Sequence, residues 1–256
     1  MRKTLDNNEI VNTIPTNKQT NKHGIRTARL LFEQSGTFKK EFKKLGVEAY
    51  DYDILNEYGQ TDYQIDLFEQ IQKAYGGGES IFDSFTPDDV IMAFFPCTRF
   101  ECQAQMMFAG NQFQATNMSD EYKLEYDLKI HKELSELYDN LTKLTLVVIR
   151  KGLRMVIENP ATQPHYLTNY WCMKPAIIDK DRRLNGDYCT KPTQYWFIGF
   201  EPEQNVVFEP LDYVEQRRIE KMKNQEKSRK TMRSEIHPQY ASRFIRQYIL
   251  KDGGTI

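Results

Sequence analysis

A short apolar run in the middle of the chain gives the clearest indication of the fold. Val90–Phe95 contains six consecutive apolar residues and ends directly at Pro96. A short continuous apolar run of this kind is typical of a parallel strand that is buried on both faces. Because proline disfavours the helical region for the residue before it, the strand should end at Phe95. The sequence therefore predicts a buried strand over residues 88–95, in a sheet covered on both faces.

Strand and helix patterns alternate along the rest of the chain. Further strands are predicted at Arg29–Phe32, Val47–Asp53, Met155–Ile157, Pro175–Asp179 and Tyr195–Phe200. Helices are predicted at Phe38–Leu45, Gln64–Ala74, Asp120–Gly152 and near Tyr240–Leu250. The third helix is long and amphipathic, because leucines recur in it at spacings of three and four residues. Such alternation predicts an α/β fold, a three-layer sandwich with helices on both sides of a parallel sheet.

The 256 residues suit one large domain, or one domain with a small appendage. Residues 1–25 are rich in Asn, Thr and Lys and predict a flexible lead-in, so the domain is expected at 26–250. Ten acidic residues and one lysine lie between Tyr50 and Val90, whereas Val214–Arg233 holds eight Lys or Arg and three Glu. The first stretch could favour a cationic small molecule and the second a polyanion such as nucleic acid. Two solvated charged faces are the alternative.

Membrane and metal partners are not expected. No apolar run approaches the roughly 20 residues that a membrane helix needs, and residues 1–22 lack the apolar centre of a signal peptide. The four cysteines show no CxxC pair and no spacing typical of a zinc site. The composition therefore predicts a cytoplasmic protein with reduced cysteines.

The predicted strand ends carry the residues of chemical interest. Ligands of open parallel sheets bind beyond the carboxyl ends of the strands. Gln34–Thr37, Pro96–Thr98 and Glu158–Pro160 each follow a predicted strand. Cys97 and Glu158 could therefore face one cleft as nucleophile and acid. Taken singly, Cys97 could be a small buried side chain, and Glu158 could cap a helix or join an ion pair.

The order and spacing of these segments resemble the cytosine carbon-5 DNA methyltransferases, in the compact form common among phage and mobile-element proteins. Arg29–Phe38 resembles their first motif, a Phe-x-Gly-x-Gly loop that holds the methionine part of S-adenosylmethionine. Gly36 and Phe38 match that motif, while Gln34 stands where its first glycine should be. The resemblance implies a Rossmann-like class I S-adenosylmethionine-dependent methyltransferase sheet. It covers roughly residues 29–250.

Other segments extend this resemblance. Phe95-Pro96-Cys97 resembles the Pro-Pro-Cys nucleophile motif, and Glu158-Asn159-Pro160 resembles the Glu-Asn-Val motif. Lys191-Pro-Thr with Trp196, and the segment Arg233–Ala241, are weaker matches. The implied cofactor residues are Phe32, Ser35, Gly36, Phe38, Asp53 on the ribose hydroxyls, Asp66 beside the adenine, and Pro96.

The resemblance implies a covalent mechanism. Cys97 would add to C6 of a flipped cytosine in DNA, so that C5 can take the methyl group from S-adenosylmethionine. Glu158 would protonate or hydrogen-bond N3, and Asn159 would hold the Glu158 carboxyl group. Arg99 and Lys191 would contact the nucleic acid, although a surface ion pair is an equal alternative for Arg99.

The chain also departs from the family pattern. It has no Gln-x-Arg-x-Arg motif for the arginine that contacts cytosine O2, a role for which Lys191 or Arg183 is available. The recognition region is reduced, near residues 160–195. Sequence readout is therefore either minimal, or supplied by residues 111–118 and 165–188, or supplied by a partner. A basic helical segment is expected at 214–250. The alternatives are a catalytically degenerate nucleic-acid or protein binding module, and an RNA or nucleotide methyltransferase. The biological role could be restriction-modification or phage DNA modification.

Overall fold

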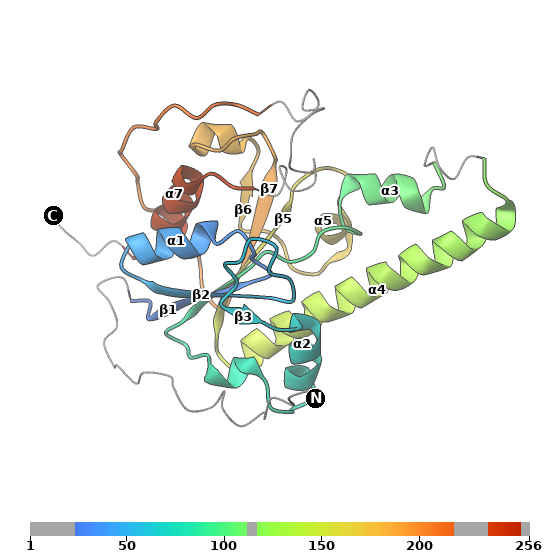
Figure 1. Ribbon diagram of the computed structural model, residues 1–256, viewed down its shortest axis with the longest axis horizontal. Helices are drawn as coiled ribbons and strands as arrows, with labels where there is room; N and C mark the ends of the chain where they lie inside the picture. Colours follow the sequence, from blue (N-terminus) through green and yellow to red (C-terminus); the bar gives the residue numbers. More distant parts are fainter. Residues whose placement is uncertain (1–23, 112–116, 218–234, 252–256) are drawn as a thin grey trace, which may run out of the picture.

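The computed structural model describes residues 24–111, 117–217 and 235–251. Seven strands form one mixed sheet in the order β3-β2-β1-β4-β5-β7-β6 (Figure 1). The strands are β1 (Thr27–Leu31), β2 (Glu48–Asp53), β3 (Tyr63–Gln64), β4 (Val90–Ala93), β5 (Arg154–Pro160), β6 (Ile177–Asp179) and β7 (Thr193–Ile198). The first five strands of that order are parallel, and β7 is antiparallel to both β5 and β6. The chain therefore has an α/β fold with a mostly parallel sheet, consistent with a Rossmann-like layout.

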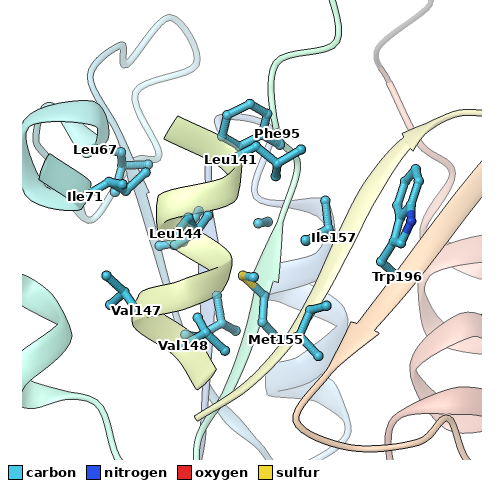
Figure 2. Packing of buried hydrophobic residues seen from close by; sticks show 14 of the residues in the cluster. Leu67, Ile71, Phe95, Leu141, Leu144, Val147, Val148, Met155, Ile157 and Trp196 are labelled. Atoms are coloured by element: carbon cyan, nitrogen blue, oxygen red, sulfur yellow. The ribbon is translucent and has the colours of Figure 1, made fainter. Parts of the chain in front are cut away.

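Helices cover both faces of this sheet (Figure 1). On one face, α1 (Thr37–Lys44) and α7 (Pro238–Tyr248) pack on Met92, Val156 and Tyr195. On the other, α2 (Leu67–Tyr75) and α4 (Asp120–Arg150) pack on Ile157 and Trp196. Figure 2 shows this second cluster, with Leu144 and Val148 of α4 beside β5. Because strand side chains alternate, neighbouring residues of β5 belong to different cores.

Four shorter helical elements complete the described fold: η1 (Ile81–Ser84), α3 (Cys102–Phe108), α5 (Tyr166–Tyr170) and η2 (Arg182–Asn185). The helices α3 and α5 belong to the connections that follow β4 and β5, and η2 lies between β6 and β7. No helix in the described part of the chain is long and apolar enough to cross a membrane.

The predicted central strand is confirmed as a buried strand, since all four residues of β4 are buried, but it ends at Ala93 and not at Phe95. The prediction of the second helix was wrong at its start, because Tyr63 and Gln64 form β3 and the side chain of Asp66 caps α2. The long helix is confirmed, but Leu124 and Leu128 of its first turns are 67% and 73% exposed. The first part of α4 extends beyond the sheet, so these two leucines remain exposed (Figure 1).

The two ends of the predicted domain also differ from expectation. Ile25 is buried, and the Arg26 amide donates to the Asp88 carbonyl at 2.8 Å, so ordered structure reaches into the expected lead-in. Residues 1–23, residues 112–116 of the 111–118 loop and residues 218–234 of the basic segment lie outside the described residues. Residues 214–217 are not helical, and α7 confirms the predicted last helix.

Candidate active site

The strand order reverses between β1 and β4, which lie side by side at the centre of the sheet. In open α/β sheets, ligands bind beyond the carboxyl ends of the strands at such a switch point. The chain leaves β1 through Phe32, leaves β4 through Cys97, and reaches Glu158 within β5. The topology alone therefore brings all three predicted segments to one edge of the sheet.

A pocket of about 440 Å³ opens at this edge, a size usual for small-molecule sites. We call it the strand-end pocket, and it is lined by Phe32, Gln34, Asp53, Ile54, Leu55, Asp66, Leu67, Phe68, Phe94 and Pro96. Four of the predicted cofactor residues are among them, namely Phe32, Asp53, Asp66 and Pro96. Ser35, Gly36 and Phe38 are not.

Aromatic packing shapes one wall of the strand-end pocket. Phe32 has a φ of 61°, in the left-handed region that a bulky residue rarely adopts. Its ring centroid lies 5.6 Å from that of Phe68 and 5.2 Å from that of Phe95. Its amide donates to the Tyr52 carbonyl at 2.8 Å. Strained residues of this kind cluster at ligand sites, where the surrounding structure holds them in place.

The acids of the strand-end pocket are already engaged with backbone amides. Asp53 is buried and accepts from the Leu55 amide at 2.8 Å. Burial raises the pKa of Asp53, while hydrogen bonds from Leu55 and Gln34 oppose the rise. Asp66 is exposed, and its Oδ1 accepts from Phe68 and Glu69 at 2.9 and 3.2 Å. Asp66 thus caps α2, a role not predicted from the sequence.

Ser35 and Gly36 lie in the loop between β1 and α1, and Phe38 lies in the first turn of α1. Gly36 has a φ of 65°, and a side chain there would meet the Gln60 Oε1 atom at 3.0 Å. Ser35 Oγ lies 3.2 Å from Thr37 Oγ1 and accepts from the Thr37 amide at 3.3 Å. Phe38 is fully buried under the sheet. These residues shape the loop beside the pocket rather than line it.

Sequence reasoning missed Glu33 in this loop. Its Oε1 accepts from the Phe38 amide at 2.9 Å, and its Oε2 is buried without a hydrogen-bond partner. Burial raises the pKa of Glu33 to about 7. An acid just before a predicted helix start was the available signal, since carboxylates favour helix N-termini.

The second part of the site is built around Cys97. The amides of Phe100 and Glu101 donate to the Cys97 carbonyl at 2.8 and 3.2 Å, which folds the chain into a turn. The Asn159 side-chain amide donates to the Phe95 carbonyl at 2.9 Å, and the Tyr166 amide donates to that of Phe100 at 2.8 Å. Segments at and after the end of β5 therefore hold both ends of the Cys97 turn.

The predicted role of Asn159 was wrong. Its amide donates to the backbone carbonyl of Glu158 at 2.8 Å and not to the Glu158 carboxyl group. The reason is the alternation of a strand, which sends neighbouring side chains to opposite faces. Asn159 fixes the backbone between β4 and β5.

Cys97, Glu158 and Lys191 form what we call the thiol cluster. Glu158 is 7% exposed and its Oε1 makes no hydrogen bond, while Lys191 Nζ lies 4.0 Å from that oxygen. Burial raises the pKa of the Cys97 thiol to about 11, the Lys191 ammonium lowers it, and the carboxylates of Glu158 and Glu101 raise it further. The charges of Glu158 and Lys191 thus act on the Cys97 thiol through partly desolvated space.

The other two candidate cations are paired elsewhere. Arg99 donates to Glu133 of α4 at 2.7 Å and forms an ion pair with it, which is the alternative noted from the sequence. Arg183 is exposed and binds both carboxylate oxygens of Asp181, at 2.9 and 2.6 Å. Its neighbour Arg182, which sequence reasoning passed over, is fully buried. The sequence offers no signal that separates the two arginines.

Within the described residues, no group of three or more His, Cys, Asp or Glu side chains could hold a metal ion. No model of a known protein family matches this chain, and no curated protein is significantly similar to it. The arrangement described above offers an apolar pocket with one buried carboxylate, and beside it a thiol, a carboxyl group and an ammonium.

Proposed function

We propose that this protein is an S-adenosylmethionine-dependent DNA cytosine-C5 methyltransferase. The observation that carries the proposal is the thiol cluster, in which Cys97 shares a partly buried space with Glu158 and Lys191. A thiol nucleophile, an acid and a cation are the groups that covalent activation of a pyrimidine needs. The sequence resemblance to the methyltransferases supports the same assignment.

The strand-end pocket fits the methyl donor. Its volume of about 440 Å³ and its aromatic wall suit an adenosine, and Asp53 offers a buried carboxylate at the end of β2. The negative charge of Asp53 and Asp66 favours a ligand with a positive sulfur. When bound, S-adenosylmethionine supplies the methyl group that the cytosine ring takes.

The thiol cluster would generate its own nucleophile. With a pKa of about 11, only about one Cys97 in ten thousand is a thiolate at neutral pH. A net transfer of the Cys97 proton to Glu158 yields the thiolate and the carboxylic acid together. It also removes the Glu158 charge that raises the thiol pKa, and leaves Lys191 beside the new anion.

Addition of the Cys97 thiolate would then activate the cytosine ring. The thiolate forms a bond to C6, the C5–C6 electron pair becomes available at C5, and negative charge that develops at N3 is met by the Glu158 proton. C5 would gain the methyl group and leave the donor as a neutral thioether. A water molecule would then take the C5 proton, Cys97 would leave C6 as the thiolate, and the N3 proton would return to Glu158, which restores the aromatic base. Inside a duplex neither carbon is accessible, so the base must be flipped out or presented in single-stranded DNA.

Trapping the covalent adduct tests this proposal. DNA that carries 5-fluorocytosine cannot lose the C5 substituent, so wild-type protein with cofactor should form a stable complex that maps to Cys97. Cys97→Ser should form none, whereas Cys102→Ser, a matched change in α3, should behave as wild type. Absence of an adduct on DNA would contradict the proposal, and an adduct only with RNA or dCMP would move the activity to that acceptor.

A second function, a binding module without turnover, is favoured by Gln34. This residue stands where the family has glycine, and its side chain lies in the strand-end pocket as a hydrogen-bond partner of Asp53. Calorimetric titration of S-adenosylmethionine into wild type and Gln34→Gly measures its effect. Binding only by Gln34→Gly would favour the module, and comparable binding by both would favour the enzyme.

A further inference from the structure

A buried ion pair lies behind the thiol cluster and takes no part in the mechanism above. Arg182 of η2 and Asp187 are both fully buried, and their side chains form a salt bridge. The second carboxylate oxygen of Asp187 accepts from the amides of Tyr188 and His237, each at 2.8 Å. His237 is the residue that caps α7. Asp187 is therefore fixed by backbone groups from two segments, and it fixes Arg182 in turn.

Hydrogen bonds connect this pair to Lys191. Arg182 Nη1 lies 3.5 Å from Thr193 Oγ1, and the same hydroxyl donates to the Lys191 carbonyl at 3.0 Å. Since the hydroxyl proton is used toward Lys191, the oxygen is free to accept from the guanidinium. The ammonium of Lys191 then reaches to 4.0 Å from Glu158 Oε1.

The pair lies on the same face of the sheet as Glu158. Glu158 is opposite Tyr195 in the β5–β7 ladder, and Thr193 is two residues from Tyr195, so all three side chains share one face. The hydroxyl of Tyr195 lies 2.9 Å from that of Tyr240, and the Arg182 guanidinium stacks on the Tyr240 ring at 4.7 Å. A continuous buried polar layer thus runs from α7 to the thiol cluster.

We infer that the Arg182–Asp187 pair is a positioning element that holds Lys191, through Thr193, beside Cys97 and Glu158. Stability is a weak reason for keeping such a pair, because replacing a buried ion pair by apolar side chains is often neutral or stabilising. The Arg182 guanidinium is held by Asp187 and also bonds to Thr193, so it does define where the start of β7 lies. The inference rests on the proposed function only in taking Cys97 as the working thiol.

The reactivity of Cys97 toward iodoacetamide tests the inference without DNA, cofactor or turnover. Only the thiolate reacts, so at pH 8 the rate falls about tenfold for each unit by which the pKa rises. Lys191→Met removes the cation and should slow alkylation at Cys97, followed by peptide mass spectrometry. The double variant Arg182→Met/Asp187→Leu should slow it in the same way, and adding Lys191→Met to it should cause little further loss.

Controls separate positioning from folding. Arg183→Met alters the exposed neighbour and should leave alkylation at the wild-type rate, and Arg182→Lys should lie between wild type and the double variant. Thr193→Val removes only the connecting hydroxyl and should slow alkylation even if the double variant fails to fold. Wild-type alkylation rates in a folded double variant or in Thr193→Val would overturn the inference. This outcome is independent of adduct trapping, so the inference and the proposed function can fail separately.

Discussion

The strand-end pocket and the thiol cluster lie at the same edge of the sheet but differ in how their polar groups are satisfied. In the pocket, Asp53 and Asp66 already accept hydrogen bonds from backbone amides, and most of the wall is apolar. In the thiol cluster, the buried Glu158 Oε1 has no hydrogen-bond partner, and Cys97 has a raised pKa. Buried polar atoms without partners cost free energy that a well-satisfied fold avoids.

This difference separates the shape of the site from its chemistry. The two carboxylates of the strand-end pocket need no ligand to satisfy them, whereas Gln34 Oε1 is buried there without a hydrogen-bond partner. The pocket can therefore bind by apolar contact with few polar constraints. The thiol cluster holds a thiol whose pKa depends on the charges beside it, and a ligand with hydrogen-bonding edges would complete it. Perturbation of the thiol cluster should therefore change rate, and perturbation of the pocket should change stability and affinity.

The largest expected effect is that of Glu158→Gln. Glutamine keeps the shape but cannot deliver a proton, so methyl transfer should fall by about a hundredfold to ten-thousandfold, the usual contribution of a general acid. The measurement is incorporation of labelled methyl groups into DNA. Glu101→Gln is the matched control, because Glu101 also raises the pKa of Cys97 but has no role in the chemistry. Equal losses in both variants would remove the distinction between the two carboxylates.

The next effect is the pH dependence of stability caused by Glu33, in the loop beside the strand-end pocket. Its pKa is about 7 in the folded protein against 4.5 normally, so the folded state binds the proton more tightly. Its contribution to stability is thus lost as the pH rises from about 4.5 to about 7. Glu33→Gln mimics the protonated form. The free energy of unfolding of Glu33→Gln, measured in urea relative to wild type, should therefore rise by about 3 kcal/mol between pH 4.5 and pH 8. An offset that does not change with pH would show that Glu33 titrates normally.

The smallest effect distinguishes two roles for Asp66. As a helix cap, Asp66→Ala should cost about 1 kcal/mol of unfolding free energy, whereas Asp66→Asn retains the cap and should cost little. As a ligand of the adenine, both changes would weaken S-adenosylmethionine binding. Thermal unfolding and calorimetric titration of the two variants measure the two quantities side by side. Unchanged stability in Asp66→Ala would contradict the capping role.

Most of the fold could be predicted because its signals are local. The apolar run of β4 and the leucine spacing of α4 depend only on the burial of nearby residues, and both elements form where expected. Element ends were less predictable: Gln64 pairs in β3 instead of starting a helix, because pairing with β2 competes with helical propensity. The exposure of Leu128 shows the opposite case, where a correct helix extends past the surface that its pattern would bury.

The candidate site also has a part that the sequence predicted and a part that it could not predict. Sequence alone predicted that Cys97 and Glu158 follow buried strands and could face one cleft, because the carboxyl ends of parallel strands meet at one edge. The structure makes these strands the neighbours β4 and β5, and Glu158 lies within β5 rather than after it. Only the tertiary structure decided which cation joins them. Because β7 is antiparallel to β5, its first residues lie beside the end of β5, and Lys191 just before β7 lies beside Glu158. Arg99 and Arg183 are instead held by other carboxylates. Arg182 is fully buried. Side chains far apart along the chain leave no periodic trace, so their meeting depends on strand pairing and packing rather than on local pattern.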